Sequence, residues 1–277
     1  MNMKFSRLGP CCLLLLFWTQ VATAQVNSQQ PELKYVMKID FSLYPIFQSN
    51  LSLPDRRQLR VYHQVSTAKT DPDGYEYADI SLNFGSALGP KYPTFSSWIQ
   101  YNGIRHGTIL PAFGRIYEVT HITVSKEYHH MVRIAVLAPE NIPTGVTAGY
   151  PTHLATLGGI VSWGPEIKTD SCSLEFIAST PMKDKEEPVL SLRTRYTTDF
   201  KSATDKKTTV HDLKAKLGDT ILVGDRGHKI VNVVPPSAKT KVIGWVELDP
   251  NGLTEKEMTE KKITPIKGNL VSPQERK

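Results

Sequence analysis

Residues 218–248 read GDTILVGDRGHKIVNVVPPSAKTKVIGWVEL, and this stretch decides the fold that the sequence predicts. Two runs rich in β-branched residues, 220–223 and 229–234, flank the turn-forming residues 224–227. β-Branched side chains suit a pleated strand better than a helix, and Gly and Asp accept turn conformations. A third apolar run, at 242–248, follows a pair of prolines, whose missing N–H groups end the second run. The stretch therefore predicts three short strands joined by turns.

The same pattern occurs earlier in the chain, at residues 107–139. At its start, Thr108-Ile109-Leu110 matches Thr220-Ile221-Leu222, and Gly114 matches Gly227. After a shift of one residue, 117–122 matches 228–233, Leu137 matches Leu248, and Pro139 matches Pro250. Identical residues are few, but the spacing holds across the segment without a gap after that shift. We therefore expect a duplicated small β-unit, with similar β-patterning as the alternative explanation.

Strand patterns separated by turn residues continue through most of the chain, whereas helical signals are limited to residues 211–217 and 254–262. Repeated short strands favour antiparallel sandwiches or small barrels. The predicted fold is therefore all-β and mostly antiparallel, with two related small β-sandwich or barrel-like domains in tandem.

A connection rich in Pro, Gly and Thr around Gly145 divides the predicted domains. The expected parts are a signal peptide at 1–24, an N-terminal β domain at 25–144, a C-terminal β domain at 145–252 and a charged C-terminal tail at 253–277. The sequence also predicts a loop at 49–58, a β-hairpin whose turn is Thr70-Asp71-Pro72-Asp73-Gly74, one strand at 154–163 and a charged connection at 202–209.

The first 24 residues have the pattern of a secretory signal. Lys4 and Arg7 precede an apolar run at 11–21, and Ala22-Thr23-Ala24 supplies the small residues of a cleavage site. The apolar run is shorter than the ~20 residues that span a bilayer. We therefore expect cleavage near Ala24 and export to the periplasm or extracellular space, with no transmembrane segment in the mature chain.

Export leaves Cys172 as the only cysteine of the mature chain, so no intramolecular disulfide is expected.

The formal charge of +6 falls to +4 when Lys4 and Arg7 are removed, and the remaining Lys and Arg are scattered among acids. A nucleic-acid binder would cluster its cations with aromatics between them. Nucleic acid is therefore not an expected partner.

Catalytic and metal motifs are weak. The chain contains no CxxC and no HExxH, and the adjacent His129 and His130 would point to opposite faces of a strand. The other residues weighed for chemistry were His121, His153, Cys172, Asp71, Asp73, Asp184, Glu186, Glu187, Asp219 and Asp225, which are interpreted as surface, strand, loop or turn residues. The sequence therefore predicts no catalytic, cofactor-binding or metal residue and no cofactor.

The first half is rich in aromatic residues that suit either a carbohydrate- or peptide-binding surface or a β-core: Tyr62, Tyr75, Tyr77, Tyr92, Phe95, Trp98 and Tyr101. The expected function is a non-catalytic binding or structural component of the cell envelope or extracellular space, with carbohydrate or another envelope protein as partner. One alternative is a secreted, polysaccharide-directed hydrolase whose carboxylate pair is assembled by the fold. Another is an interaction module that pairs through an open sheet edge.

Overall fold

The computed structural model describes residues 34–42, 49–52, 58–86, 95–125, 130–148, 152–165, 171–180, 187–198 and 207–271. The predicted signal peptide lies outside the described residues. From Tyr35 onward the chain forms one compact unit. None of the described helices is long and apolar enough to cross a bilayer.

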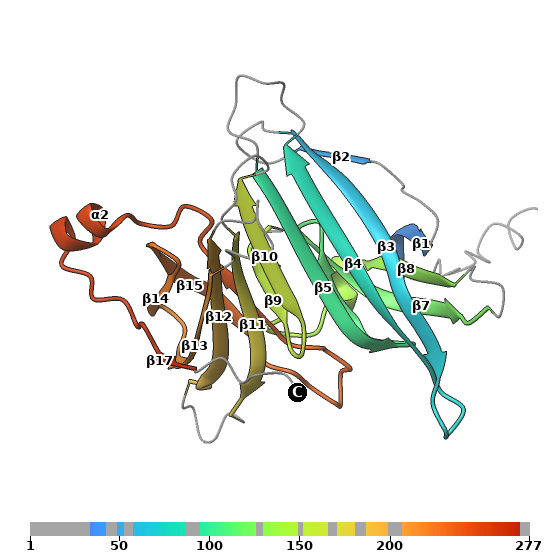
Figure 1. The fold of residues 1–277 in the computed structure, drawn as a ribbon. Helices are drawn as coiled ribbons and strands as arrows, with labels where there is room; N and C mark the ends of the chain where they lie inside the picture. The colour runs from blue at the N-terminus through green and yellow to red at the C-terminus, as the bar shows by residue number, and fades with distance from the viewer. Residues whose placement is uncertain are drawn as a thin grey trace, which may run out of the picture. The chain divides into compact units, whose positions relative to one another are not determined.

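Nine strands form one continuous antiparallel sheet (Figure 1). In spatial order they are β17 (Asn269–Leu270), β13 (Lys207–Ala215), β12 (Leu190–Thr198), β11 (Ser171–Ser179), β10 (Ile160–Pro165), β5 (Phe95–Arg105), β4 (Glu76–Ser86), β3 (Gln58–Thr70) and β2 (Ser49–Ser52). The first and second halves of the chain meet in this sheet where β5 pairs with β10.

Each half also contributes a smaller antiparallel sheet. The first has the order β1 (Tyr35–Ser42), β8 (Met131–Leu137), β7 (Arg115–Thr123), β6 (Ile109–Ala112), and the second has the order β9 (Leu154–Thr156), β16 (Trp245–Leu248), β15 (Arg226–Val234), β14 (Thr220–Val223). In both halves the first strand of the small sheet precedes a four-strand stretch of the large sheet, after which three strands complete the small sheet. The fold is thus all-β and antiparallel, and none of its three described sheets closes into a barrel.

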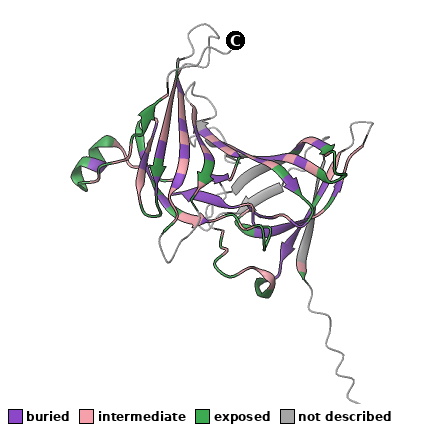
Figure 2. Cartoon of the chain, turned by 90° about the horizontal axis from the view of Figure 1, so that it is seen from below, coloured by how far each residue is buried: buried purple, intermediate pink, exposed green. Residues whose placement is uncertain are grey.

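The core lies between the large sheet and the two small ones. Leu82, Ile99, Val161 and Leu174 face one another across β4, β5, β10 and β11, and all four are buried. Residues alternate between the two faces of a strand, and Figure 2 shows buried and more exposed positions alternating along several strands of the chain. The small sheets supply Tyr117, Ile134, Ile221, Ile230 and Trp245 to the same core.

The predicted hairpin at residues 70–75 is confirmed. The Asp71 carboxylate accepts hydrogen bonds from the backbone N–H groups of Asp73 (3.1 Å) and Tyr75 (2.8 Å), and Gly74 has a φ of 85°. This is the Asx-type turn that the sequence predicts, and it joins β3 to β4.

The turns that lead into the two small sheets have the same hydrogen bonds. The Arg105 N–H donates to the Thr108 hydroxyl (2.9 Å), and the Lys216 N–H donates to the Asp219 carboxylate (2.7 Å). Between them lie Gly107 (φ 81°) and Gly218 (φ 87°), each of which donates to a carbonyl of the following long strand, that of Val119 (2.7 Å) or Ile230 (2.9 Å). Together with the pairing of the strands that follow, these contacts align residues 105–123 with residues 216–234, an offset of 111 residues.

The structural match between the two halves differs from the sequence alignment at the start and at the end of the repeated segment. Ile109 matches Thr220 and not Ile221, because both hairpins have two-residue loops and need no shift. After the long strands the second connection, 235–244, is three residues longer than the first, 124–130, so Ile134 and not Leu137 matches Leu248.

Three expected elements differ from the structure. Part of the loop predicted at 49–58 is β2, and the strand predicted at 154–163 is broken into β9 and β10 by a turn at Gly158, whose φ is 71°. The predicted charged connection and helical turn around 202–217 contain β13, which pairs with β12 along its whole length. The helical signal at 254–262 corresponds to α2 (Glu255–Glu260), which has a capping box at Thr254 and buries Met258.

Each small sheet has an edge strand that is covered by a later segment. On β6, Ile109 exchanges backbone hydrogen bonds with Lys241 (2.8 Å) and Ile243 (3.0 Å). On β14, Ile266 donates to Thr220 (2.8 Å) and accepts from Leu222 (2.9 Å). These parallel bridges satisfy backbone groups that an open edge would expose, and the first of them builds the wall of the groove described next.

Candidate functional site

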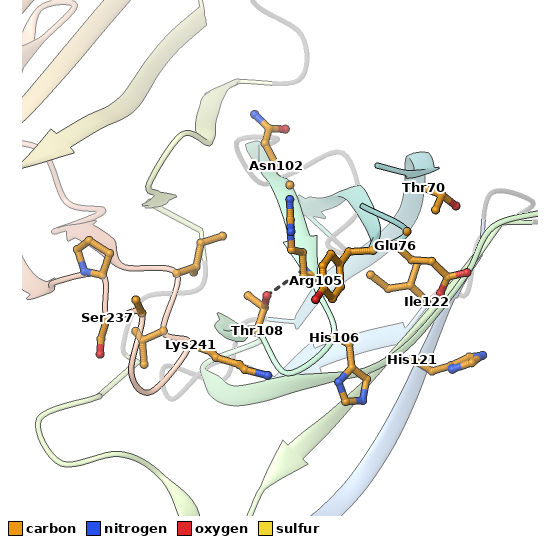
Figure 3. A pocket seen from close by; sticks show the side chains of 17 residues that line it. Thr70, Glu76, Asn102, Arg105, His106, Thr108, His121, Ile122, Ser237 and Lys241 are labelled. Carbon is orange, nitrogen blue, oxygen red and sulfur yellow. Dashed lines mark hydrogen bonds between the residues drawn. The ribbon is translucent and has the colours of Figure 1, made fainter. Parts of the chain in front are cut away.

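A groove of about 830 Å³ lies beside the covered edge of β6 (Figure 3). Four separated stretches line it: the β3–β4 turn at 70–76, the end of β5 with the following turn at 102–108, β7 at 121–122, and the segment 236–243. The last stretch comes from the second half of the chain. The groove therefore exists only when the two halves are joined.

Lys241 is held by its backbone in an unusual conformation. Its φ is 56°, in the left-handed region that side-chain-bearing residues rarely adopt. The Lys241 carbonyl accepts from the Ile109 N–H, and Ser237 and Val242 close a small loop around Lys241 with two backbone hydrogen bonds (2.9 and 3.1 Å). These bonds on both sides of Lys241 fix its backbone and determine where its side chain begins.

The Lys241 side chain lies directly over Gly107. A β-carbon placed on Gly107 would lie 2.7 Å from Lys241 Nζ and 2.9 Å from its Cδ. The ammonium group is therefore next to the turn that carries His106 and Thr108, and all three residues line the groove. No acidic side chain of the described residues forms an ion pair with Lys241.

Arg105 is the second cation of the groove, and it is paired. Its Nη2 lies 3.2 Å from Asp71 Oδ2, and the Asp71 side chain is only 13% exposed because the β3–β4 turn holds it. The pair joins the two turns on one side of the groove and orients the guanidinium. The Arg105 side chain, 55% exposed, keeps part of its surface available to solvent.

The remaining polar lining includes His106 and His121, both exposed, and Glu76. Glu76 is the only carboxylate in the described lining, whereas a glycosidase places two carboxylates across its cleft. Tyr75 also lines the groove and is 63% exposed, so it offers an aromatic face to a ligand. Of the other first-half aromatics, Tyr101 is buried and donates to the Pro111 carbonyl (2.7 Å), Tyr77 and Trp98 are half-buried, and the side chains of Tyr62, Tyr92 and Phe95 lie outside the described part.

The structure separates the histidines that the sequence singled out. His121 is in the groove, whereas His153 is buried, with its ring centroid 4.8 Å from that of Trp163 and 5.8 Å from that of His228. Burial, aided by His228, lowers the pKa of His153 to about 3, and burial also lowers the pKa of His228. These two rings are uncharged parts of the core. His130 accepts from the Ser125 N–H (3.2 Å), and His129 lies outside the described residues.

The other weighed residues have the structural roles expected of them. Cys172 lies on β11, with Sγ 3.9 Å from the Val223 carbonyl, and Asp219 and Asp225 lie in turns. Asp184 and Glu186 lie outside the described residues. Within the part of the chain that the structure describes, no three His, Cys, Asp or Glu side chains gather as metal ligands.

Sequence reasoning missed Lys241, Arg105 and His106 as site residues. The available signal was the lysine-bearing segment between Pro236 and Val242, which is longer than a hairpin loop requires. Comparison of the chain with models of known protein families, with curated protein sequences and with solved structures gives no match. The site must therefore be interpreted from its own geometry.

Proposed function

We propose that the protein is an exported, non-catalytic binding protein that holds an anionic group of an extracellular glycan in this groove. The observation that carries the proposal is Lys241, whose backbone is held by hydrogen bonds and whose ammonium lies over Gly107 without an acidic partner among the described residues. A left-handed lysine costs about 1–2 kcal/mol. Such local strain is concentrated at binding sites, which favours a functional role for Lys241.

The groove chemistry fits a carboxylate or sulfate carried on a sugar. Lys241 supplies a positive charge and His106 a ring N–H donor, while the guanidinium of Arg105 is kept in place by Asp71. The exposed ring of Tyr75 provides a flat apolar face for the sugar itself. Export of the protein, which rests on the pattern of residues 1–24, would place this groove where such glycans occur.

We also infer that the two halves are copies of one unit. The matching turns at Gly107 and Gly218, and the bulge at the same matched position of β7 and β15, support duplication. Two groove residues do not follow this match: Leu217 stands at the position of His106, and Asn232 at that of His121. The shared framework is therefore structural, and the groove joins residues of the first half to the segment 236–243 of the second half.

The proposal is tested with the mature chain, residues 25–277, titrated with heparin and polygalacturonate at low and physiological salt, with neutral dextran as reference. We expect saturable binding to a polyanion that weakens with salt, and about tenfold weaker binding for Lys241→Met, a loss of roughly 1.4 kcal/mol. Lys262→Met is the matched control, because Lys262 is an exposed lysine with a φ of 55° outside the groove.

Two outcomes would contradict the proposal. Equal binding of the Lys241→Met variant and the unchanged protein would remove Lys241 from the site. Reducing sugar released in the same samples, and lost in Glu76→Gln, would instead support the hydrolase alternative.

A further inference from the structure

The outer face of the nine-stranded sheet carries a second, differently composed surface. Cross-strand pairing aligns Asn83, Trp98, Ser162, Ser173 and Arg195, one each from β4, β5, β10, β11 and β12. Side chains paired in this way point to the same side of a sheet. Their chain neighbours Leu82, Ile99, Val161, Leu174 and Thr194 are buried in the core, so this row lies on the opposite face.

A second row runs beside the first on the same face. It consists of Ser81, Gln100, Ile160, Glu175, Arg193 and Asp212, from β4 through β13. Both rows cross the pairing of β5 with β10, where the two halves meet. The surface thus belongs to both halves of the chain and not to the groove.

The charges of this surface neutralise one another. Arg193 forms a bidentate pair with Asp212 (2.6 and 3.0 Å), and Glu175 accepts from Arg195 (3.3 Å) and lies 3.8 Å from Arg193. The guanidinium of Arg193 lowers the pKa of Asp212, so the pair stays ionised. These two rows match two cations to two anions, so they offer hydrogen-bonding groups with little net charge to attract a polyanion, and Lys214 is a further cation exposed on the same face at β13.

The row of Trp98 has small residues at its centre. Ser162 and Ser173 lie between Trp98 and Arg195 in the cross-strand register. Strands lie about 4.8 Å apart, so the backbone positions of Trp98 and Arg195, three strands apart, stand roughly 14 Å from each other. The row therefore has a planar side chain at each end and a length sufficient for more than one sugar ring.

We propose that this face binds a neutral polysaccharide chain lying across β5 to β12. One sugar ring stacks on Trp98, and ring hydroxyls exchange hydrogen bonds with Gln100, Glu175 and Arg195. Neutral sugars are the fitting ligand because the charged side chains are already paired and an aromatic ring stacks on the apolar face of a sugar. The proposal is independent of the groove, which takes an anionic group.

The test is affinity electrophoresis of the mature chain in gels containing hydroxyethylcellulose, laminarin, xylan or galactomannan, with heparin gels as the anionic arm. We expect retardation in at least one neutral gel, about tenfold weaker apparent affinity for Trp98→Ala, and recovery of most of it in Trp98→Phe. Ser162→Gln places a longer side chain beside Trp98 on the same face and should abolish the retardation without affecting the fold. Leu217→Ala changes an exposed apolar residue outside both this face and the groove, so it is the control and should keep the retardation.

Fluorescence provides a second readout. Trp163 and Trp245 are buried, and Trp18 lies in the predicted signal peptide, so Trp98 is the half-buried tryptophan of the mature chain. The neutral polysaccharide should change its emission, and Trp98→Phe should lose that change. No retardation in any neutral gel would overturn the proposal, as would Trp98→Ala or Ser162→Gln running like the unchanged protein.

Discussion

Lys241 lies so close over Gly107 that a side chain at residue 107 would occupy the space that the lysine takes. The Lys241 Nζ would lie 2.7 Å from a β-carbon at that position, a distance that real β-carbons essentially never show. The two residues come from different halves of the chain, and the hydrogen bond from the Ile109 N–H to the Lys241 carbonyl (2.8 Å) holds them together. The groove therefore depends on a glycine for space as well as for its positive φ.

Gly107→Ala should move Lys241 and weaken polyanion binding about tenfold. The positive φ of 81° adds a stability cost of about 1 kcal/mol for a residue with a β-carbon. Titration with heparin and urea denaturation measure the two effects separately.

The Gly218→Ala variant separates the effect of backbone strain at a positive φ from the effect of moving the Lys241 side chain. Gly218 has a φ of 87° in the matching turn, and a β-carbon there meets nothing within 4 Å. We expect a similar loss of stability, about 1 kcal/mol, with unchanged binding. A Gly218→Ala variant that binds as poorly as Gly107→Ala would show that the turns act through the whole fold and not through Lys241.

Lys241→Gly should affect stability and binding in opposite directions. Glycine adopts a positive φ without strain, so the free energy of unfolding should rise by up to about 1 kcal/mol, while the loss of the ammonium weakens heparin binding. Lys262→Gly, at a φ of 55°, should give a similar stabilisation with binding intact. If Lys241→Gly lowers stability, the side chain of Lys241 contributes more to packing than its strain costs.

The parts of the fold that were predicted from sequence depend on local signals. Residues 70–75 contain an Asp, Pro and Gly turn whose hydrogen bonds are short-range, and the β-branched strand 229–234 falls within β15. β13 was missed because residues 202–209 look like a charged connection and residues 211–217, with the charged Asp212 and Lys214, carry a helical signal. Only the paired strand β12, which supplies Arg193 opposite Asp212, makes those charges compatible with a sheet.

The groove could not be predicted for a different physical reason. Its lining is drawn from stretches up to about 170 residues apart in sequence, from Thr70 to Ile243. The position of Lys241 is set by a parallel bridge to Ile109, and no spacing within either stretch encodes that contact. His121 was noticed in the sequence, but only the fold shows that it shares a groove with Lys241, while His153 lies in the core.

Stability should fall between pH 7.5 and pH 5 because of His153. Its folded pKa of about 3 lies below the ordinary value of 6.5, so in this range the unfolded chain binds a proton that the folded chain does not. The contribution of His153 to the free energy of unfolding is fully present above pH 7 and decreases as the pH falls toward 3. The loss at pH 5 is on the order of 2 kcal/mol from this group, with His228 adding to it.

Urea denaturation at the two pH values measures this loss, and His153→Phe provides the comparison. The variant should lose much less stability between pH 7.5 and pH 5, retaining only the share that comes from His228. Carboxylates remain mostly ionised in this window, so they contribute little. An equally steep loss in the variant would mean that other groups take up the proton.

Trp245→Phe should destabilise the protein more than Trp163→Phe. Both indoles are buried, but Trp245 Nε1 donates to the Thr147 carbonyl and to the Glu247 carboxylate, each at 3.2 Å, whereas Trp163 makes no hydrogen bond among the described residues. Each variant loses similar volume, which costs about 1 kcal/mol. Trp245→Phe also removes a donor from a carboxylate that is 1% exposed, and this adds roughly 1.5–3 kcal/mol. Urea denaturation at pH 7.5 measures both costs. Equal costs for the two variants would mean that Asn232, which also donates to Glu247 (3.2 Å), satisfies the carboxylate without Trp245.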